Sequence, residues 1–158
     1  MITVLSDTHY NTGFSLPGKI LELISKSRYV VHCGDFVSTE FYNFMKSSHK
    51  LIAVKGNNDH ALSDVLETEE QFSCGGIKFA VTHGHLIKKN DLHYAFPEAD
   101  VILYGHHHHP EISFLGDKMI LSPGSLTANR YVDYNSYMTI ELNNGEKPVV
   151  EILKAYSG

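Results

Sequence analysis

Five short clusters along the sequence carry residue types that bind metal ions or transfer protons. Each contains carboxylate, amide or imidazole groups, and the five are Asp7-Thr8-His9, Gly34-Asp35, Gly56-Asn57-Asn58-Asp59, His83-Gly84-His85 and Gly105-His106-His107-His108. These groups are the oxygen and nitrogen ligands that Mn, Fe and Zn accept. The chain has 11 histidines, and histidine is also the usual acid–base group near neutral pH. The clusters therefore indicate metal-assisted or acid–base chemistry.

A single cluster of this kind carries little information. An isolated Asp-x-His sequence is more often a turn than a metal site, and a motif remains a hypothesis until its structural context supports it. The alternative interpretation is five unrelated polar loops. What favours a common site is position, because each cluster directly follows an apolar run that we predict to be a strand.

The first half of the chain alternates predicted strands and helices. Apolar runs at residues 2–6, 29–33 and 51–55 predict strands, and helical spacing of apolar residues at 18–27 and 39–47 predicts helices between them. This order indicates a parallel sheet with right-handed crossovers. Because ligands bind beyond the carboxyl ends of such strands, the first three clusters should lie together.

The second half is richer in predicted strands. The pair Gly75-Gly76 is typical of a hairpin turn, and a short helix is predicted at 90–96, before Pro97. The fourth cluster follows the predicted strand 78–82 and the fifth follows 101–104. Further strands are predicted at 71–74, 112–115, 119–121, 137–142 and 149–153. No repeat or linker interrupts the chain, so we predict a single domain over residues 1–158.

Composition excludes several classes of protein. The 158 residues are 42% apolar and 20% charged, as in ordinary globular proteins. A formal net charge of −5 argues against membrane-surface binding and against sequence-specific nucleic-acid binding. Cys33 and Cys74 form neither a disulfide framework nor a zinc-finger pattern. No signal peptide and no apolar run of about 18 residues is present, so we predict a cytoplasmic protein without a membrane partner.

The motifs together resemble a known family. The series DxH, GD, GN-x-D, HG and GHxH is similar to that of the calcineurin-like metallophosphoesterases, in particular their small single-domain bacterial and archaeal phosphodiesterases. The sequence SPGS at 122–125 resembles a further loop of these small members. The resemblance extends over nearly the whole chain. It implies an α/β fold, a four-layer α/β/β/α sandwich with mixed sheets, and a site at the edge where strand ends converge.

The resemblance also implies a site for two metal ions. Asp35 would bridge them, the first ion would be held with Asp7, His9 and His108, and the second with Asn57, His83 and His106. His107 and His109 are predicted non-ligands. Alternate side chains of an extended segment point the same way, so we expect His106 and His108, and likewise Asp7 and His9, to face one cavity. This mixture of donors favours divalent transition metals, with Mn²⁺ expected first and Fe²⁺, Zn²⁺ or Ni²⁺ as alternatives.

The activity implied is metal-dependent phosphodiester hydrolysis. A hydroxide bridging the two metals would attack the phosphorus of a small phosphate-ester substrate. One alternative is a phosphomonoesterase or nucleotidase on the same fold. Another is a non-catalytic interaction scaffold, as in a eukaryotic sorting-complex subunit that resembles this fold. Self-association into a homo-oligomer is also in keeping with the small members of the family.

One position departs from the family pattern. The third motif usually has a histidine, thought to protonate the leaving group, where this chain has Asn58. Asparagine cannot supply that proton, although it can bind a phosphate oxygen. His85 is the candidate replacement donor, with a supporting or surface role as its alternative. We also expect Asp59 to orient the Asn57 loop and Cys33 to be buried in its strand. Substrate specificity should come from the loops at 10–18, 60–70, 85–97 and 122–135.

Overall fold

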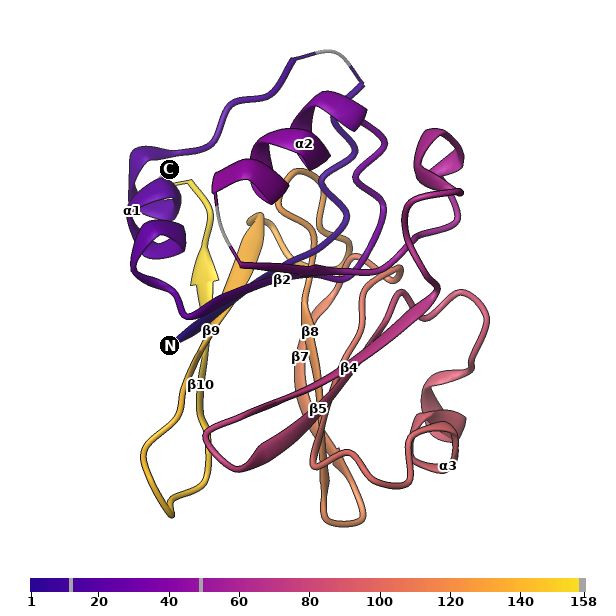
Figure 1. Cartoon of the computed structure of the whole chain (residues 1–158), viewed down its shortest axis with the longest axis vertical. Helices are drawn as coiled ribbons and strands as arrows, with labels where there is room; N and C mark the ends of the chain where they lie inside the picture. The colour runs from indigo at the N-terminus through magenta and orange to yellow at the C-terminus, as the bar shows by residue number, and fades with distance from the viewer. Residues whose placement is uncertain (12, 49, 157–158) are drawn as a thin grey trace.

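The protein is built from two five-stranded mixed sheets, seen in the computed structural model of Figure 1, which describes residues 1–11, 13–48 and 50–156. The first sheet has the strand order β10-β9-β1-β2-β3. The second has the order β4-β5-β6-β8-β7. The strands are β1 (Ile2–Leu5), β2 (Tyr29–His32), β3 (Leu51–Ala53), β4 (Glu69–Cys74), β5 (Ile77–Thr82), β6 (Val101–Leu103), β7 (Pro110–Leu115), β8 (Lys118–Pro123), β9 (Ser136–Glu141) and β10 (Val149–Lys154).

Each sheet combines three parallel strands with antiparallel pairs. In the first sheet β1, β2 and β3 run parallel, and β9 and β10 form an antiparallel pair beside β1. In the second sheet β5, β6 and β8 run parallel, whereas β4 and β7 pair antiparallel at the edges. The parallel strands of each sheet therefore direct their carboxyl ends to one edge, as the alternation of strands and helices predicts.

Alternation of side chains along the strands creates the layers. Odd-numbered residues of β5 and β6, such as Phe79 and Val101, pack between the two sheets, whereas Ala80 and Ile102 face the other way. On the first sheet Val31 faces the second sheet and Val30 faces the helices. Strands that are apolar on both faces are typical of sheets covered on both sides. The sheets therefore pack on each other through one face and on helices through the other.

Helices cover the two outer faces. Helix α1 (Gly18–Lys26) and helix α2 (Thr39–Ser48) pack on the first sheet through apolar side chains that include Ile20, Ile24 and Phe41. Helix α3 (Leu92–Ala95) packs on the second sheet through Leu92. The order of layers is α/β/β/α, which confirms the predicted fold class.

The predicted elements are all present, with differences at their ends. The expected helix at 90–96 is a 3₁₀ turn, Lys89–Asp91, followed by the single helical turn of α3. It is short because Phe96 leaves the helical conformation before Pro97, and a residue before proline is sterically disfavoured there. β7 begins at Pro110, two residues earlier than predicted, because the segment continues its pairing with β8 up to Pro123.

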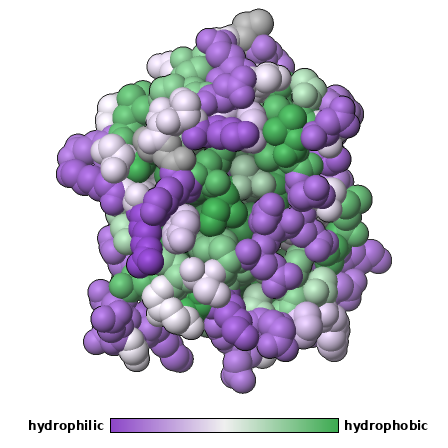
Figure 2. Space-filling model, in the orientation of Figure 1, coloured by the Kyte–Doolittle hydropathy of each residue, from purple (hydrophilic) through white to green (hydrophobic). Residues whose placement is uncertain are grey.

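The surface is mixed in character. Hydrophilic and apolar residues are interspersed over the face shown in Figure 2. Within the described part of the chain, none of the helices combines the length and the hydropathy needed to cross a bilayer.

Candidate metal centre

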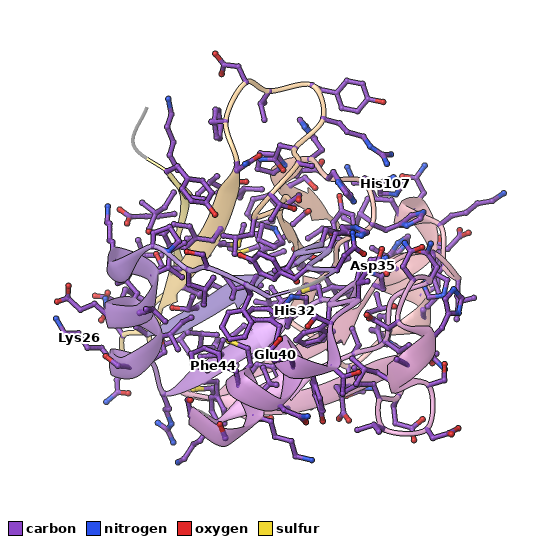
Figure 3. All side chains as sticks on the ribbon, turned by 90° about the horizontal axis from the view of Figure 1, so that it is seen from above. Lys26, His32, Asp35, Glu40, Phe44 and His107 are labelled. Carbon is purple, nitrogen blue, oxygen red and sulfur yellow. The ribbon has the colours of Figure 1, made fainter. Side chains whose placement is uncertain are left out.

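The five clusters meet at one edge of the molecule. Asp7 and His9 follow β1, Asp35 follows β2 and Asn57 follows β3, all from the first sheet. His83 follows β5, and the remaining two predicted ligands, His106 and His108, follow β6 of the second sheet. Viewed from above, Asp35 and the neighbouring His107 lie on the side of the molecule opposite Lys26 of α1 (Figure 3). The two sheets thus contribute to a single cluster.

One group of side chains gathers around Asp7. Its Oδ1 atom lies 3.3 Å from Nε2 of His108 and 3.8 Å from Nε2 of His9. The two histidine Nε2 atoms lie 3.2 Å from each other. These three residues have ligand atoms close enough together to share one ion.

A second group gathers around Asp35 and Asn57. Nε2 of His83 lies 3.5 Å from Oδ2 of Asp35 and 3.1 Å from Oδ1 of Asn57. Nδ1 of His106 lies 3.1 Å from the same Asn57 oxygen. Oδ2 of Asp35 is also 3.4 Å from Nε2 of His9, a member of the first group. Asp35 therefore contacts histidines of both groups, and so does Asp7, whose Oδ1 lies 3.9 Å from Nε2 of His83.

The outer nitrogens of two histidines are held by backbone carbonyls. Nδ1 of His83 lies 2.7 Å from the carbonyl oxygen of Cys33, and Nδ1 of His108 lies 2.7 Å from that of Ala128. A carbonyl only accepts hydrogen bonds, so each Nδ1 carries the hydrogen. In the neutral ring, Nε2 then presents its lone pair to the cluster. This arrangement of a held histidine is typical of metal ligands.

The side chains of Asp7 and His9, and those of His106 and His108, reach the same cluster, but not because their segments are extended, as we predicted. Asp7 and His9 have φ values of 50° and 47°, and His106 and His108 have 70° and 53°. These four residues are left-handed rather than extended, a conformation that is uncommon outside glycine. Such strain at several residues of one cluster is maintained by surrounding contacts and is concentrated at functional sites.

Glycines allow the cluster to close. Gly34 has a φ of +95°, and a Cβ there would lie 2.7 Å from both the backbone nitrogen of Gly56 and Nδ1 of His83. A Cβ on Gly105 would overlap the Ser6 hydroxyl and lie 2.8 Å from Oδ2 of Asp7. These two positions require a residue without a side chain because the loops from the two sheets touch there.

The carboxylates and histidines shift one another's pKa values. Burial would raise the pKa of Asp7, but the imidazoles of His108 and His9 outweigh it and hold that pKa below its usual value. Burial also opposes ionisation of Asp35, yet contact with His83 lowers its pKa to about 2. Contact with Asp7 raises the pKa of His108. Both carboxylates are therefore ionised at neutral pH, as metal ligands must be.

A buried carboxylate oxygen of Asp7 indicates whether a cation fits this cluster. Oδ1 of Asp7 is buried, and no described residue donates a well-directed hydrogen bond to it. Its other oxygen accepts hydrogen bonds from the Ser6 hydroxyl (2.6 Å) and the His106 backbone N–H (3.0 Å). Buried charge without a partner is costly, and Oδ1 faces the nitrogens of three histidines. A divalent cation would satisfy this oxygen and the inward-facing lone pairs together, so the residues fit the implied metal.

The two predicted catalytic residues lie beside the second group. Asn58 is exposed, and its side-chain amide donates a hydrogen bond to Oδ2 of Asp35 at 2.8 Å. The His85 ring lies 5.3 Å from that of His83 and 6.2 Å from that of His106, between centroids. Burial, and after it the proximity of His83, lower the pKa of His85. His85 is thus close to the centre but mostly neutral at pH 7.

Several hydroxyl-bearing residues, whose roles the sequence did not reveal, position the predicted ligands. Ser6 holds Asp7 from the end of β1. Ser125, in the SPGS sequence, donates its hydroxyl to the Asp7 carbonyl oxygen at 2.7 Å. Thr127 donates to the carbonyl oxygen of Thr8 at 3.2 Å. Serine and threonine in loops are too common for sequence to reveal such roles.

Asp59 acts as expected on the Asn57 loop. One of its oxygens accepts hydrogen bonds at 2.8 Å from the backbone N–H groups of both Asp35 and Gly56, and the other accepts one from Val37. This buried carboxylate ties the loop after β3 to the loop after β2. Cys33 is fully buried, as expected.

With the fold and the cluster in view, comparison with known proteins identifies the class. The profile of the calcineurin-like phosphoesterase superfamily domain matches residues 1–145. The chain therefore belongs to the calcineurin-like phosphoesterase superfamily, as its motifs predict. A probable metallophosphoesterase of Methanocaldococcus jannaschii is 34% identical over 137 residues, which cover 82% of this chain and 70% of that protein. A phosphodiesterase of the same organism is 32% identical over 143 residues, covering 78% and 82%.

Solved structures share the architecture. A Streptococcus pneumoniae protein described as a conserved uncharacterized protein and predicted phosphoesterase has a TM-score of 0.79, with 27% identity over 98% of this chain and 88% of that one. Vps29 of Entamoeba histolytica, solved in complex with Zn²⁺, has a TM-score of 0.76, with 23% identity over 98% and 99%. The second likeness concerns the fold alone.

Proposed function

We propose that this protein is a metal-dependent phosphodiesterase that hydrolyses a small phosphate diester. The observation that carries the proposal is the buried, unsatisfied Oδ1 of Asp7, which faces histidines from both sheets. Beside it lies Asp35, a second carboxylate close to two of the same histidines. A relative named as a phosphodiesterase supports the same activity. Mn²⁺ is the metal we propose, because carboxylate, amide and imidazole donors occur together.

The seven proposed ligands would divide between two ions. Asp7, His9 and His108 would hold one ion and Asn57, His83 and His106 the other, with Asp35 common to both. Two bound divalent cations would activate water and neutralise charge on the phosphoryl group.

Two further polar side chains, those of Asn58 and His85, would take part in the reaction. The amide of Asn58 would orient a phosphoryl oxygen, since it is exposed beside Asp35. His85 would deliver a proton to the leaving group. Because its pKa is lowered, it would do so best below neutral pH.

The test is hydrolysis of bis(p-nitrophenyl) phosphate with Mn²⁺, with and without a chelator. We expect metal-dependent hydrolysis of the diester that is faster than hydrolysis of p-nitrophenyl phosphate. Asp35→Asn should lower the rate of diester hydrolysis by at least about 100-fold, because both metal ions and the water bound to them would depend on the Asp35 carboxylate. Faster turnover of the monoester would favour a phosphomonoesterase instead. A folded protein without metal-dependent turnover would favour an interaction scaffold.

Adjacent histidines provide a matched control for the ligand assignment. His106→Ala should lose metal in an equilibrium measurement of bound Mn²⁺, because its ring faces Asn57. His107→Ala should keep the wild-type metal content, because its side chain is exposed and lines the neighbouring pocket. Equal metal loss in the two variants would contradict the assignment.

A further inference from the structure

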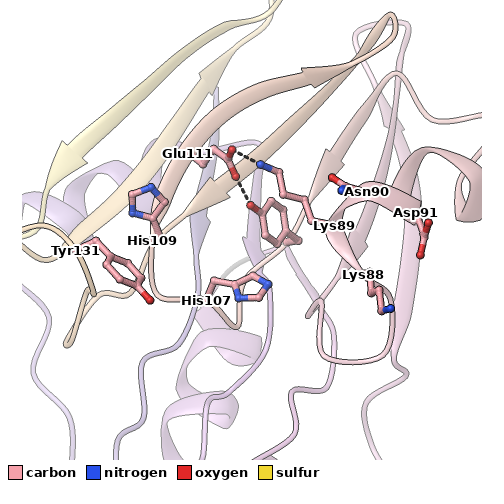
Figure 4. A pocket seen from close by; sticks show the side chains of 9 residues that line it. Lys88, Lys89, Asn90, Asp91, His107, His109, Glu111 and Tyr131 are labelled. Carbon is pink, nitrogen blue, oxygen red and sulfur yellow. Dashed lines mark hydrogen bonds and ion pairs between the residues drawn. The ribbon is translucent and has the colours of Figure 1, made fainter.

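A pocket of about 720 Å³ opens beside the candidate metal centre, on the far side of His107. In Figure 4, Tyr131 and His109 lie on one side of it, Lys89 lies on the other, and His107 lies between them. Its volume is within the range of small-molecule sites, roughly 300–1,000 Å³. It is larger than a phosphoryl group alone needs.

The pocket and the candidate metal centre are connected by the segment that carries His107. His107 lies between two proposed ligands, and its ring is 5.2 Å from that of His106, centroid to centroid. The loop that carries Tyr131 is fastened to the same segment, because the Arg130 backbone N–H donates a hydrogen bond of 2.6 Å to the His108 carbonyl oxygen. A smaller hollow lined by His85 and His106 shares His107, Lys88 and Lys89 with this pocket. A group attached to a phosphate at the centre would reach the pocket through that hollow.

The walls of the pocket are aromatic. The rings of His109 and Tyr131 meet edge to face with centroids 5.9 Å apart, and the rings of Tyr104 and His107 meet in the same way at 6.2 Å. Aromatic side chains in edge-to-face pairs leave ring faces available to a further planar group.

Tyr131 is held at the rim against its conformational preference. Its side chain is 89% exposed, although it is a large aromatic residue. Its φ is +65°, which is an outlier for a bulky residue. Exposure and backbone strain in one residue have no evident benefit for folding, and such outliers are concentrated at functional sites.

The charges of the pocket balance. Lys89 forms an ion pair with Glu111, which also accepts a hydrogen bond from the Tyr104 hydroxyl (Figure 4). The positive charge of the second lysine, Lys88, is balanced by the negative charge of Asp91, which also lines the pocket. A pocket with two cationic and two anionic side chains suits an uncharged group better than a second phosphate.

We propose that this pocket binds a planar aromatic ring carried by one ester group of the substrate, with His107 and Tyr131 as specificity-determining residues. The substrate class is then phosphate esters whose alcohol bears such a ring, as nucleosides do. The proposal rests on the proposed function for the position of the phosphate and extends it to the attached group.

The test compares two phosphates that differ by a ring. Dissociation constants of adenosine 5′-monophosphate and ribose 5-phosphate are measured by calorimetry on the Mn²⁺-loaded protein, with chromatography of the recovered probe to verify that it stays intact. We expect the ring-bearing probe to bind at least about 5-fold more tightly. Stacking on an aromatic side chain contributes about 1–3 kcal/mol, so Tyr131→Ala should reduce this preference by about 5- to 150-fold. Tyr131→Phe, which retains the ring, should keep it.

An exposed aromatic residue elsewhere serves as the control. Phe114 of β7 is 59% exposed and lies outside the pocket, so Phe114→Ala should leave the preference unchanged. Equal binding of the two probes by the wild type, or a preference that survives both Tyr131→Ala and His107→Ala, would overturn the proposal.

The outcome is separable from that of the proposed function because binding is measured without turnover. Diester hydrolysis without a ring preference would overturn the pocket and leave the phosphodiesterase proposal standing. A Tyr131-dependent ring preference without diester hydrolysis would support the pocket and count against the diesterase.

Discussion

Asp7 and Asp35 follow neighbouring strands, yet their carboxylates have different environments. Ser6 and the His106 backbone fix one oxygen of Asp7 and leave the other facing three imidazoles. Asp35 is contacted by the Asn58 backbone and side chain on separate oxygens. Asp7 therefore presents to the cluster one oxygen that has no hydrogen-bond donor among the described residues, whereas both oxygens of Asp35 accept hydrogen bonds from Asn58.

His85 offers a prediction about proton transfer. If it protonates the leaving group, His85→Gln should slow hydrolysis more for a diester with a poor leaving group than for bis(p-nitrophenyl) phosphate, because general acid help is worth about 10²–10⁴-fold where the proton is needed. The measurement is kcat/KM for a p-nitrophenyl diester and for an alkyl diester. Equal losses on both substrates would assign His85 a supporting role instead.

His32 predicts a pH dependence of stability. It is fully buried, stacks on Phe36, and accepts a hydrogen bond from the Gly34 N–H through Nδ1. Burial lowers its pKa from 6.5 to about 3. Between these two pH values His32 binds a proton in the unfolded chain but not in the folded chain. The stability that neutral His32 contributes is therefore complete above pH 6.5 and is lost as the pH falls toward 3.

The measurement is urea unfolding of wild type and His32→Gln between pH 3 and 8, both with a chelator. The free energy of unfolding of the wild type minus that of His32→Gln should decrease as the pH falls, by up to about 1.4 kcal/mol per pH unit. Parallel curves for the two proteins would show that His32 does not titrate as stated.

At the scale of elements, loops are fastened to each other both between the sheets and within one sheet. Ser125, after β8, binds the loop after β1, and Asp59, after β3, binds the loop after β2. The loop after β6 approaches Asp7 through Gly105. Each ligand is thus placed by a neighbouring loop as well as by its own strand.

Substitution of a single glycine should disrupt this contact. In Gly105→Ala the new Cβ would collide with Ser6 and crowd Asp7, so we expect a loss of about 1–3 kcal/mol in stability together with weaker metal binding. Gly18→Ala is the matched control, because a Cβ there meets nothing within 4 Å and neither glycine has a positive φ. Thermal unfolding and bound Mn²⁺ are the readouts, and wild-type values in Gly105→Ala would disprove the close approach.

At the scale of the molecule, the centre joins two sheets that otherwise meet through an apolar core. Asp7, His9, Asp35 and Asn57 come from the first sheet, and His83, His106 and His108 from the second. A cation held by both sheets binds the folded chain and not the unfolded one, so it must stabilise the fold.

Metal addition should therefore raise the midpoint of thermal unfolding. At a free Mn²⁺ concentration about 100 times the dissociation constant, the gain is about 2.7 kcal/mol, or roughly 5–10 °C for a chain of this size. A chelator should reverse the shift, and Asp7→Asn should abolish it. An equal shift in Asp7→Asn would locate the stabilising ion elsewhere.

Much of this organisation was predictable from the chain. Alternating apolar runs and glycine-polar clusters predicted the strands, the helices α1 and α2 and the edge where Asp7, Asp35 and Asn57 lie. Periodicity is a local property, and residues that follow parallel strands must emerge at one edge. The motif spacing also sufficed to indicate the superfamily.

Other features depended on contacts between distant segments. The left-handed conformations of His106 and His108, the support from Ser6 and Ser125, and the pocket beneath Tyr131 all arise where loops of the two sheets meet. Local pattern specifies strands and their carboxyl ends because side-chain direction follows from the backbone repeat. It does not specify backbone strain or cavities, because these depend on which loops pack together after the sheets have formed.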